Sequence, residues 1–198
     1  MSAYLWMQRI EDFWESGGGM MLPIAVLCFL IYFTIWELFL YMNEKPFSVT
    51  SRELVEKWVV DQEQPPYEAR ELMDYVSSGQ NPDEFDIRER MKEVRSNYMP
   101  YVDRRLVFLG VLVSTAPLMG LLGTVNGMFL TFKGLSVQAG RSIDFVAKGI
   151  SEALITTQTG LLIAIPAYAL LFLIYRKRNE WISFFCLMEC ALLRKYDR

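Results

Sequence analysis

Hydrophobic residues are collected into three long runs along the chain, and most charged residues lie between them. The runs cover residues 20–42, 106–132 and 149–175. A helix rises about 1.5 Å per residue, so roughly 20 apolar residues span the hydrocarbon core of a bilayer. The pattern therefore predicts an all-α membrane protein with three transmembrane helices, of which the second and third are longer than one crossing needs.

Residues 1–19 come before the first run and mix apolar with polar positions. The apolar side chains recur at helical spacing, as Trp6, Ile10, Phe13 and Trp14. This spacing predicts an amphipathic helix that lies in the membrane interface, with a helix packed on protein as the alternative. Gly17–Gly19 would end the helix with a sharp turn. The charges that precede the apolar run argue against a cleavable signal peptide.

Basic residues set the expected orientation. They border residues 43–105, at Arg104 and Arg105, and residues 176–198, at Arg176–Arg178. By the positive-inside rule, both segments should be cytoplasmic, the first as a helical domain and the second as a tail. The second and third helices would extend into this compartment. The N-terminus and the loop 133–148 would then be periplasmic.

Composition narrows the function classes. The 198 residues are 53% hydrophobic and 22% charged, with a formal net charge of −3, no histidine and three cysteines. A net acidic chain does not suggest nucleic-acid binding. Without histidine, and without a nucleophile–base pair or phosphate loop, we expect no enzyme, no metal and no cofactor. The three apolar runs make the lipid bilayer the first partner that we expect.

The second and third runs contain more small and polar residues than lipid contact requires. The second includes Gly120, Gly123 and Thr124, and the third includes Thr156, Thr157 and Thr159. Small residues let helices approach closely, and hydroxyls bond across the contact, so these helices should pack on protein or line a polar space. Each run also contains a proline that should kink it locally, Pro117 and Pro166.

Two carboxylates lie within the runs. Glu152 shares one helical stripe with Thr156, Thr159 and Ile163, a surface suited to protons or cations, although solvation at the outer interface is the alternative. For Glu37, near the end of the first run, we favour snorkelling to the interface over an ion pair with a neighbouring helix. One chain cannot enclose a polar path, so a ring of identical subunits is expected.

Two stretches, APLMGLLGTVNGMFLTF and GISEALITTQTGLLIAIPAYALL, resemble the ExbB/TolQ/MotA proton-channel family. They lie within residues 114–172, and GGGMMLPI before the first helix agrees more weakly. Three crossings and a modest cytoplasmic insert resemble the ExbB/TolQ branch, most closely a short ExbB. The MotA branch typically has four crossings.

The resemblance implies a pentamer whose second and third helices line a pore. The pore would hold a dimer of a single-pass ExbD- or TolR-like subunit, whose aspartate carries the proton. Ion flow would power a TonB- or TolA-like transducer from the bacterial inner membrane. Glu152 matches the family's membrane glutamate, and Thr124 and Thr157 match its pore threonines. Thr115 is a weaker match, and Asn126 stands where Trp is more common.

Other functions remain open from the residues alone. The chain could form a self-sufficient cation channel or transporter, a MotA-like stator subunit, or a scaffold in which Glu152 is structural. The oxygen ligands of the polar stripe suit protons and sodium ions alike, so the sequence does not select the ion.

Overall fold

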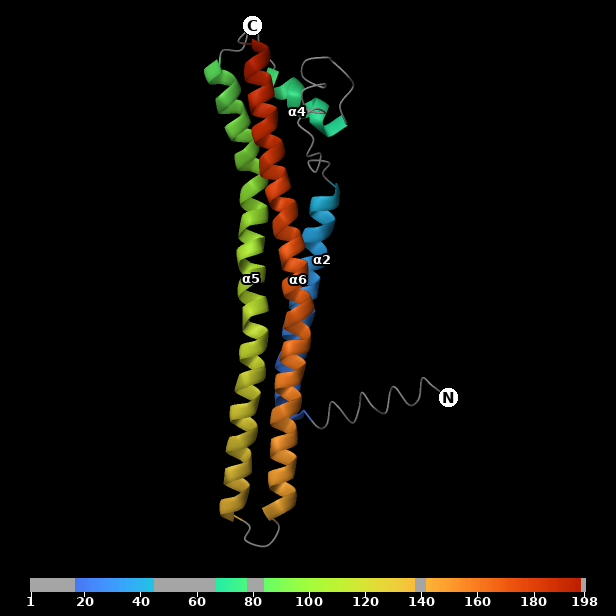
Figure 1. Ribbon diagram of the computed structural model, residues 1–198, viewed down its shortest axis with the longest axis vertical. Coiled ribbons are helices and arrows are strands. Elements are labelled where there is room, and N and C mark those ends of the chain that lie inside the picture. The colour runs from blue at the N-terminus through green and yellow to red at the C-terminus, as the bar shows by residue number, and fades with distance from the viewer. Residues whose placement is uncertain (1–16, 45–66, 78–83, 138–141, 197–198) are drawn as a thin grey trace, which may run out of the picture. The chain divides into compact units, whose positions relative to one another are not determined.

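The computed structural model describes residues 17–44, 67–77, 84–137 and 142–196, and these residues form helices without any strand. A short 3₁₀ turn, η1, spans Gly18–Met20 and leads into α2, Met21–Glu44. Helix α4 spans Tyr67–Ser77. Helices α5, Glu84–Val137, and α6, Ser142–Tyr196, follow (Figure 1).

Three of these helices are long and apolar enough to cross a membrane. They are α2, α5 and α6, which supports the predicted class of an all-α membrane protein with three crossings. Helices α5 and α6 have 54 and 55 residues, well above the roughly 20 that one crossing needs. The charged stretch 86–95 forms early turns of α5, and residues 176–196, expected as a tail, continue α6.

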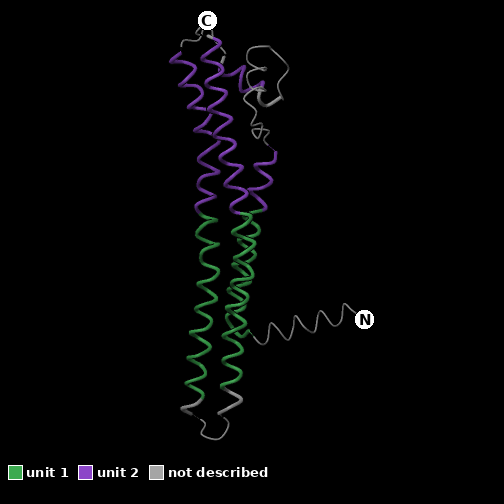
Figure 2. The backbone as a smooth tube through the Cα atoms, viewed as in Figure 1, with its two compact units in different colours: residues 1–35, 108–170 green, residues 36–107, 171–198 purple. Residues whose placement is uncertain are grey.

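The chain divides into two compact units, and α2, α5 and α6 each contribute residues to both (Figure 2). Unit 1 comprises residues 1–35 and 108–170, and unit 2 comprises residues 36–107 and 171–198. The predicted ion-pathway residues all belong to unit 1. The predicted first-span carboxylate, Glu37, belongs to unit 2.

In unit 1, the buried positions of α5 and α6 recur at intervals of three and four residues, the spacing of two helices packed along a seam. Those of α5 are Leu109, Val113, Ala116, Gly120, Gly123, Gly127 and Thr131. Those of α6 are Gly149, Ala153, Thr156, Gly160, Ala164 and Ala167. The two helices run antiparallel, because Ala116 lies beside Gly160 whereas Gly127 lies beside Gly149.

Unit 2 has a core of large side chains. Trp181, Phe184, Phe185, Met188 and Met91 are each at most 1% exposed. Helix α4 adds buried Leu72 and Val76 to the unit, and the Tyr75 hydroxyl donates to Glu93 of α5 at 2.8 Å. This hydrogen bond raises the pKa of Tyr75 because the phenol donates to an anionic carboxylate.

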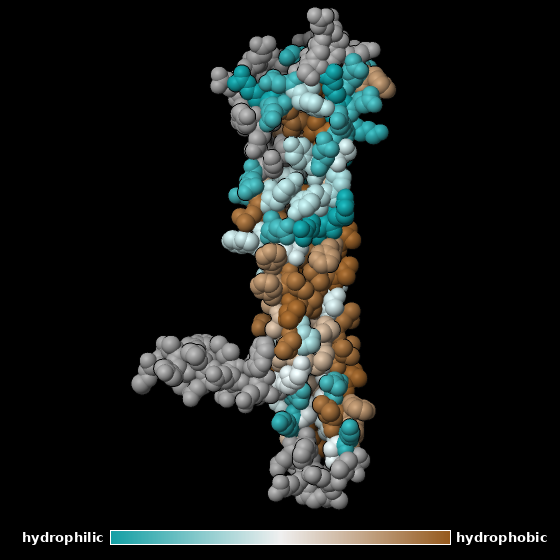
Figure 3. All heavy atoms as spheres, turned by 180° about the vertical axis from the view of Figure 1, so that it is seen from behind, coloured by the Kyte–Doolittle hydropathy of each residue, from teal (hydrophilic) through white to brown (hydrophobic). Residues whose placement is uncertain are grey.

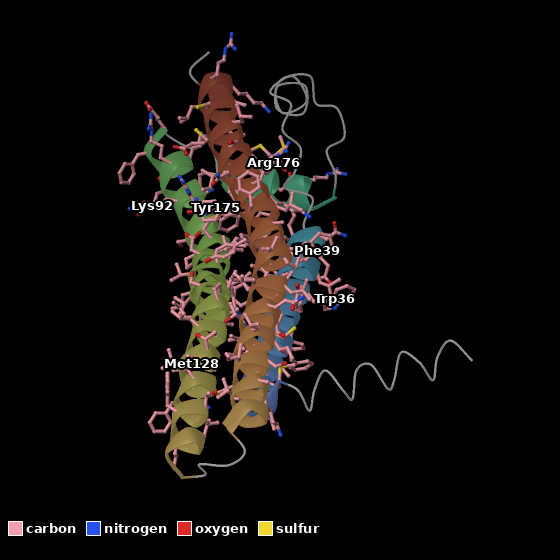
Figure 4. All side chains as sticks on the ribbon, turned by 60° about the horizontal axis from the view of Figure 1, so that its bottom comes forward. Trp36, Phe39, Lys92, Met128, Tyr175 and Arg176 are labelled. Atoms are coloured by element: carbon pink, nitrogen blue, oxygen red, sulfur yellow. The ribbon has the colours of Figure 1, made fainter. Side chains whose placement is uncertain are left out.

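Hydrophobic side chains cover the outside of unit 1, where Phe29, Leu118 and Leu162 are more than 60% exposed (Figure 3). In Figure 4, Met128 points away from α5. A soluble domain rarely exposes so large an apolar surface, whereas lipid favours it. The surface supports a membrane location for the apolar helices.

Several predictions concern residues outside the described ones. These are the amphipathic helix that ends before Gly17 and the tip of the 133–148 loop. They stay predictions.

Candidate ion-pathway site

Glycines bring the backbones of α5 and α6 close together in unit 1. A Cβ at Gly160 would lie 2.8 Å from the carbonyl oxygen of Ala116, and one at Gly120 would lie 3.1 Å from that of Thr156. At Gly123 an added Cβ would overlap the side chain of Thr156. Gly120 and Gly123, expected from the sequence to be packing positions, therefore lie in a contact that has no room for a larger residue.

The threonines of α6 use their hydroxyls in different ways. Thr156 is fully buried, and its Oγ1 donates to the carbonyls of Glu152 and Ala153 at 3.1 and 3.0 Å. Thr157 Oγ1 donates across the seam to the Gly120 carbonyl at 3.1 Å. Thr159 Oγ1 donates to Ile155 of its own helix at 2.7 Å. Thr156 and Thr157 thus contribute to helix packing within the chain.

The two predicted pathway threonines of α5, Thr115 and Thr124, lie outside the centre of the seam. Thr115 Oγ1 donates to the Val111 carbonyl and Thr124 Oγ1 to that of Leu121, both at 2.7 Å. The two threonines are nine residues apart, which at about 100° per residue places them on opposite flanks of α5. Thr124 lies one turn from Gly120, on the flank where Thr157 makes its bond.

Glu152 lies on the other flank of α6. It is five residues from Thr157, or about 140° around the helix. Its half-buried carboxylate lies against Gly18, in the turn before α2. The predicted stripe therefore divides: Thr156 faces α5, whereas Glu152 lies on the side of α6 that faces the start of α2.

Two tyrosines add polar contacts that the sequence analysis missed. The Tyr32 hydroxyl of α2 donates to the Ile163 carbonyl of α6 at 3.4 Å, and Tyr168 shares a hydrogen bond with Ser114 at 3.1 Å. The signal was available, because a tyrosine hydroxyl in an apolar helix needs a partner.

Both prolines lie within continuous helices. Helix α6 runs through Pro166, and α5 runs through Pro117. Proline has no N–H, so Pro166 leaves the Leu162 carbonyl without its usual helical donor. The carbonyl of the next residue, Ile163, is the one that Tyr32 reaches.

Glu37 corrects a prediction. Its Oε1 accepts from Arg105 Nη2 at 2.7 Å and from the Tyr101 hydroxyl at 3.0 Å, so it is paired across helices. The snorkelling interpretation that we favoured was therefore wrong, because α5 brings a cation and a phenol to the carboxylate. In the same unit, Arg178 of α6 pairs with Asp103 of α5 at 2.9 Å.

Comparison with known proteins agrees with the motifs on α5 and α6. The profile of the MotA/TolQ/ExbB proton channel family matches residues 60–185, more than half of the chain. The chain belongs to this family. Proteins named for the ExbB and TolQ branch are among its relatives, so the predicted branch is confirmed.

The similarity to individual relatives is partial. The ExbB-like 1 biopolymer transport protein of Helicobacter pylori is 43% identical over 88 residues, 44% of this chain and 46% of that protein. TolQ of the Pseudomonas aeruginosa Tol-Pal system is 46% identical over 66 residues, 33% of this chain and 29% of that protein. An ExbB-like 1 protein of Synechocystis is 26% identical over 205 residues, covering 93% and 78%. The match thus spans about half, or less, of the first two relatives.

Proposed function

We propose that this chain is the proton-conducting channel subunit of an inner-membrane motor that uses the proton motive force to power a TonB- or Tol-type process. The observation that carries the proposal is Glu152. It is the only charged residue between Lys148 and Arg176, in a helix of a proton-channel family. A carboxylate in such a segment is costly unless it faces water, protein or an ion path.

The threonines support a path formed by several subunits. Thr124 and Thr157 share the flank of the α5–α6 seam that lies away from Glu152, so one chain does not surround an ion with all of its candidate oxygens. In a ring, helices of neighbouring subunits would complete the wall. We propose a pentamer, with Thr115, Thr156 and Thr159 contributing to the path or to its support.

The partners are proposed from the family. A dimer of an ExbD- or TolR-like single-pass subunit would stand in the pore, and a TonB- or TolA-like protein would receive the work. The spans are proposed as residues 20–42, 106–132 and 149–175. The N-terminus would be periplasmic, and residues 43–105 and 176–198 cytoplasmic, in accordance with the basic residues that flank them.

The first test measures proton uptake into proteoliposomes that contain this chain and its single-pass partner. Glu152→Gln keeps the size of the side chain but cannot ionise, so we expect uptake to fall at least about tenfold. Glu180→Gln, which removes a carboxylate paired with Arg176 outside the proposed span, is the matched control. Unchanged uptake in an assembled Glu152→Gln complex would favour a scaffold.

Native mass spectrometry of the same complexes tests the assembly. Five copies of this chain with a smaller number of partner subunits would support the motor. A homo-oligomer that conducts protons without the partner would contradict the motor and indicate a self-sufficient channel. Repeating the uptake with sodium in place of a proton gradient identifies the ion.

A further inference from the structure

Gly18 lies beside the carboxylate of Glu152. It is the first residue of η1 and has a φ of +63°, in the left-handed region that glycine adopts without strain. A Cβ built on Gly18 would overlap Oε1 and Cδ of Glu152 and would lie 3.0 Å from Cγ. The carboxyl group therefore occupies the space that a side chain at this position would fill.

The neighbouring glycines have different surroundings. A Cβ at Gly19 would meet nothing within 4 Å, and the atoms nearest to one at Gly17 would belong to Met21 and Ile155. Of the three consecutive glycines, the middle one is therefore the one whose nearest neighbour is the carboxylate. A general need for a flexible turn does not account for this difference.

The contact also joins two proposed membrane helices. Glu152 lies on α6, whereas Gly18 begins the helical segment that continues into α2.

We propose that Gly18 is a positioning residue for Glu152: the absence of a side chain at Gly18 lets the carboxylate rest against the turn before α2. This inference rests on the proposed role of Glu152 in the ion path. In this role the glycine turn keeps the carboxylate at one position along α6 and on one flank of that helix. The turn before α2 is thereby coupled to the ion path.

The contacts also predict which atoms should move when a side chain is added at Gly18. The atoms that a Cβ at Gly18 would meet are the far end of a flexible side chain. At Gly160 the nearest atoms are backbone. Gly18→Ala should therefore displace the carboxylate and leave the α5–α6 contact in place, together with the modest cost of an alanine at positive φ.

The test measures how fast Glu152 reacts with dicyclohexylcarbodiimide, a hydrophobic reagent for protonated carboxyls, in the purified complex by mass spectrometry. The added methyl group should displace the carboxyl from the turn and make it easier for the reagent to reach, so we expect Gly18→Ala to raise the rate severalfold. Gly19→Ala is the matched control and should keep the original rate. Equal rates in the two variants would overturn the proposal.

Compensating substitutions separate displacement of the carboxylate from strain in the turn. Glu152→Asp withdraws the carboxyl by one methylene, so it should relieve the overlap and restore at least half of the proton uptake lost in Gly18→Ala. If the Gly18→Ala variant does not assemble, the double variant Gly18→Ala with Glu152→Ala is tested, because it lacks the carboxyl that the added methyl group would meet. Assembly of the double variant supports the contact, and its failure overturns it.

The labelling result stands apart from the proposed function. If Glu152→Gln leaves proton uptake unchanged, the ion path fails, but a faster reaction in Gly18→Ala still supports the contact. If Glu152→Gln abolishes uptake and Gly18→Ala changes neither labelling nor uptake, the ion path stands and the positioning role fails.

Discussion

Helices α5 and α6 contribute to the cores of both units, but with side chains of very different size. In unit 1 the seam between them consists mostly of glycine, alanine and threonine, and a Cβ at Gly127 would lie 2.9 Å from a carbonyl oxygen. In unit 2 the core contains Trp181, Phe184 and Phe185, all at most 1% exposed. The same two helices therefore use two kinds of packing.

The difference matches the surroundings that follow from the proposed spans, which include most of the described residues of unit 1 and only a small part of unit 2. In hydrocarbon, burying a large apolar side chain gains little, because lipid is equally apolar, and close backbone contact with interhelical hydrogen bonds holds helices together. In water, burial of apolar area is the main favourable contribution, roughly 25 cal/mol per Å². Small residues along the α5–α6 seam of unit 1 and large ones in the core of unit 2 each favour helix packing in their own surroundings.

The largest expected effect is in the core of unit 2. Trp181→Ala removes a fully buried side chain, and we expect a loss of about 3–5 kcal/mol in the free energy of unfolding. Chemical unfolding of the detergent-solubilised protein, followed by circular dichroism, measures it. Trp36→Ala is the matched control, because Trp36 is 64% exposed and points away from α2 (Figure 4). Equal losses in the two variants would contradict a core around Trp181 that is stabilised by burial of apolar area away from water.

The next effect concerns the seam of unit 1, where adding a single methyl should be harmful. In Gly160→Ala the new Cβ meets backbone of Ala116 and Gly120, which cannot move aside, so we expect about 1–3 kcal/mol of destabilisation. In Gly110→Ala the methyl meets nothing within 4 Å. That variant should be neutral or up to about 1 kcal/mol more stable, because alanine favours helix.

Thermal unfolding and native mass spectrometry of both glycine variants measure this contrast. If Gly160→Ala were as stable as Gly110→Ala, the helices would have room to separate, and close backbone contact would not distinguish unit 1 from unit 2.

The sequence was informative wherever the signal is local. Three apolar helices follow from hydropathy summed along the chain, and Gly120 and Gly123 follow from small residues within an apolar run. The side that each hydroxyl faces was less predictable. Thr156 and Thr157 are adjacent in the chain, about 100° apart around the helix. The hydroxyl of Thr156 donates to a carbonyl of its own helix, whereas that of Thr157 donates across the seam.

Contacts between residues far apart in the chain could not be predicted from one sequence. Glu37 and Arg105 are 68 positions apart, and nothing in the pattern of either helix names the other as its partner. The contact of Gly18 with Glu152 is of the same kind. The glycines predicted a turn, but the carboxylate beside it depends on how α2 and α6 pack.

The smallest effect concerns the ion pair between Glu37 and Arg105 in unit 2. Both side chains are about one third exposed, at 37% for Arg105 and 35% for Glu37, so solvent screens the pair. A double-mutant cycle of Glu37→Gln and Arg105→Gln should therefore give a coupling of about 0.5–1 kcal/mol in unfolding free energy. Raising the salt concentration from about 0.1 to 1 M should reduce that coupling, because the Debye length falls from about 10 to 3 Å.

The Tyr101→Phe variant is the control. It removes the second donor to Glu37 and leaves the cation, so its effect on the unfolding free energy should change little with salt. A coupling that does not change with salt, or that exceeds about 3 kcal/mol, would contradict a solvent-screened pair at the end of the first span and place the pair in a dry environment.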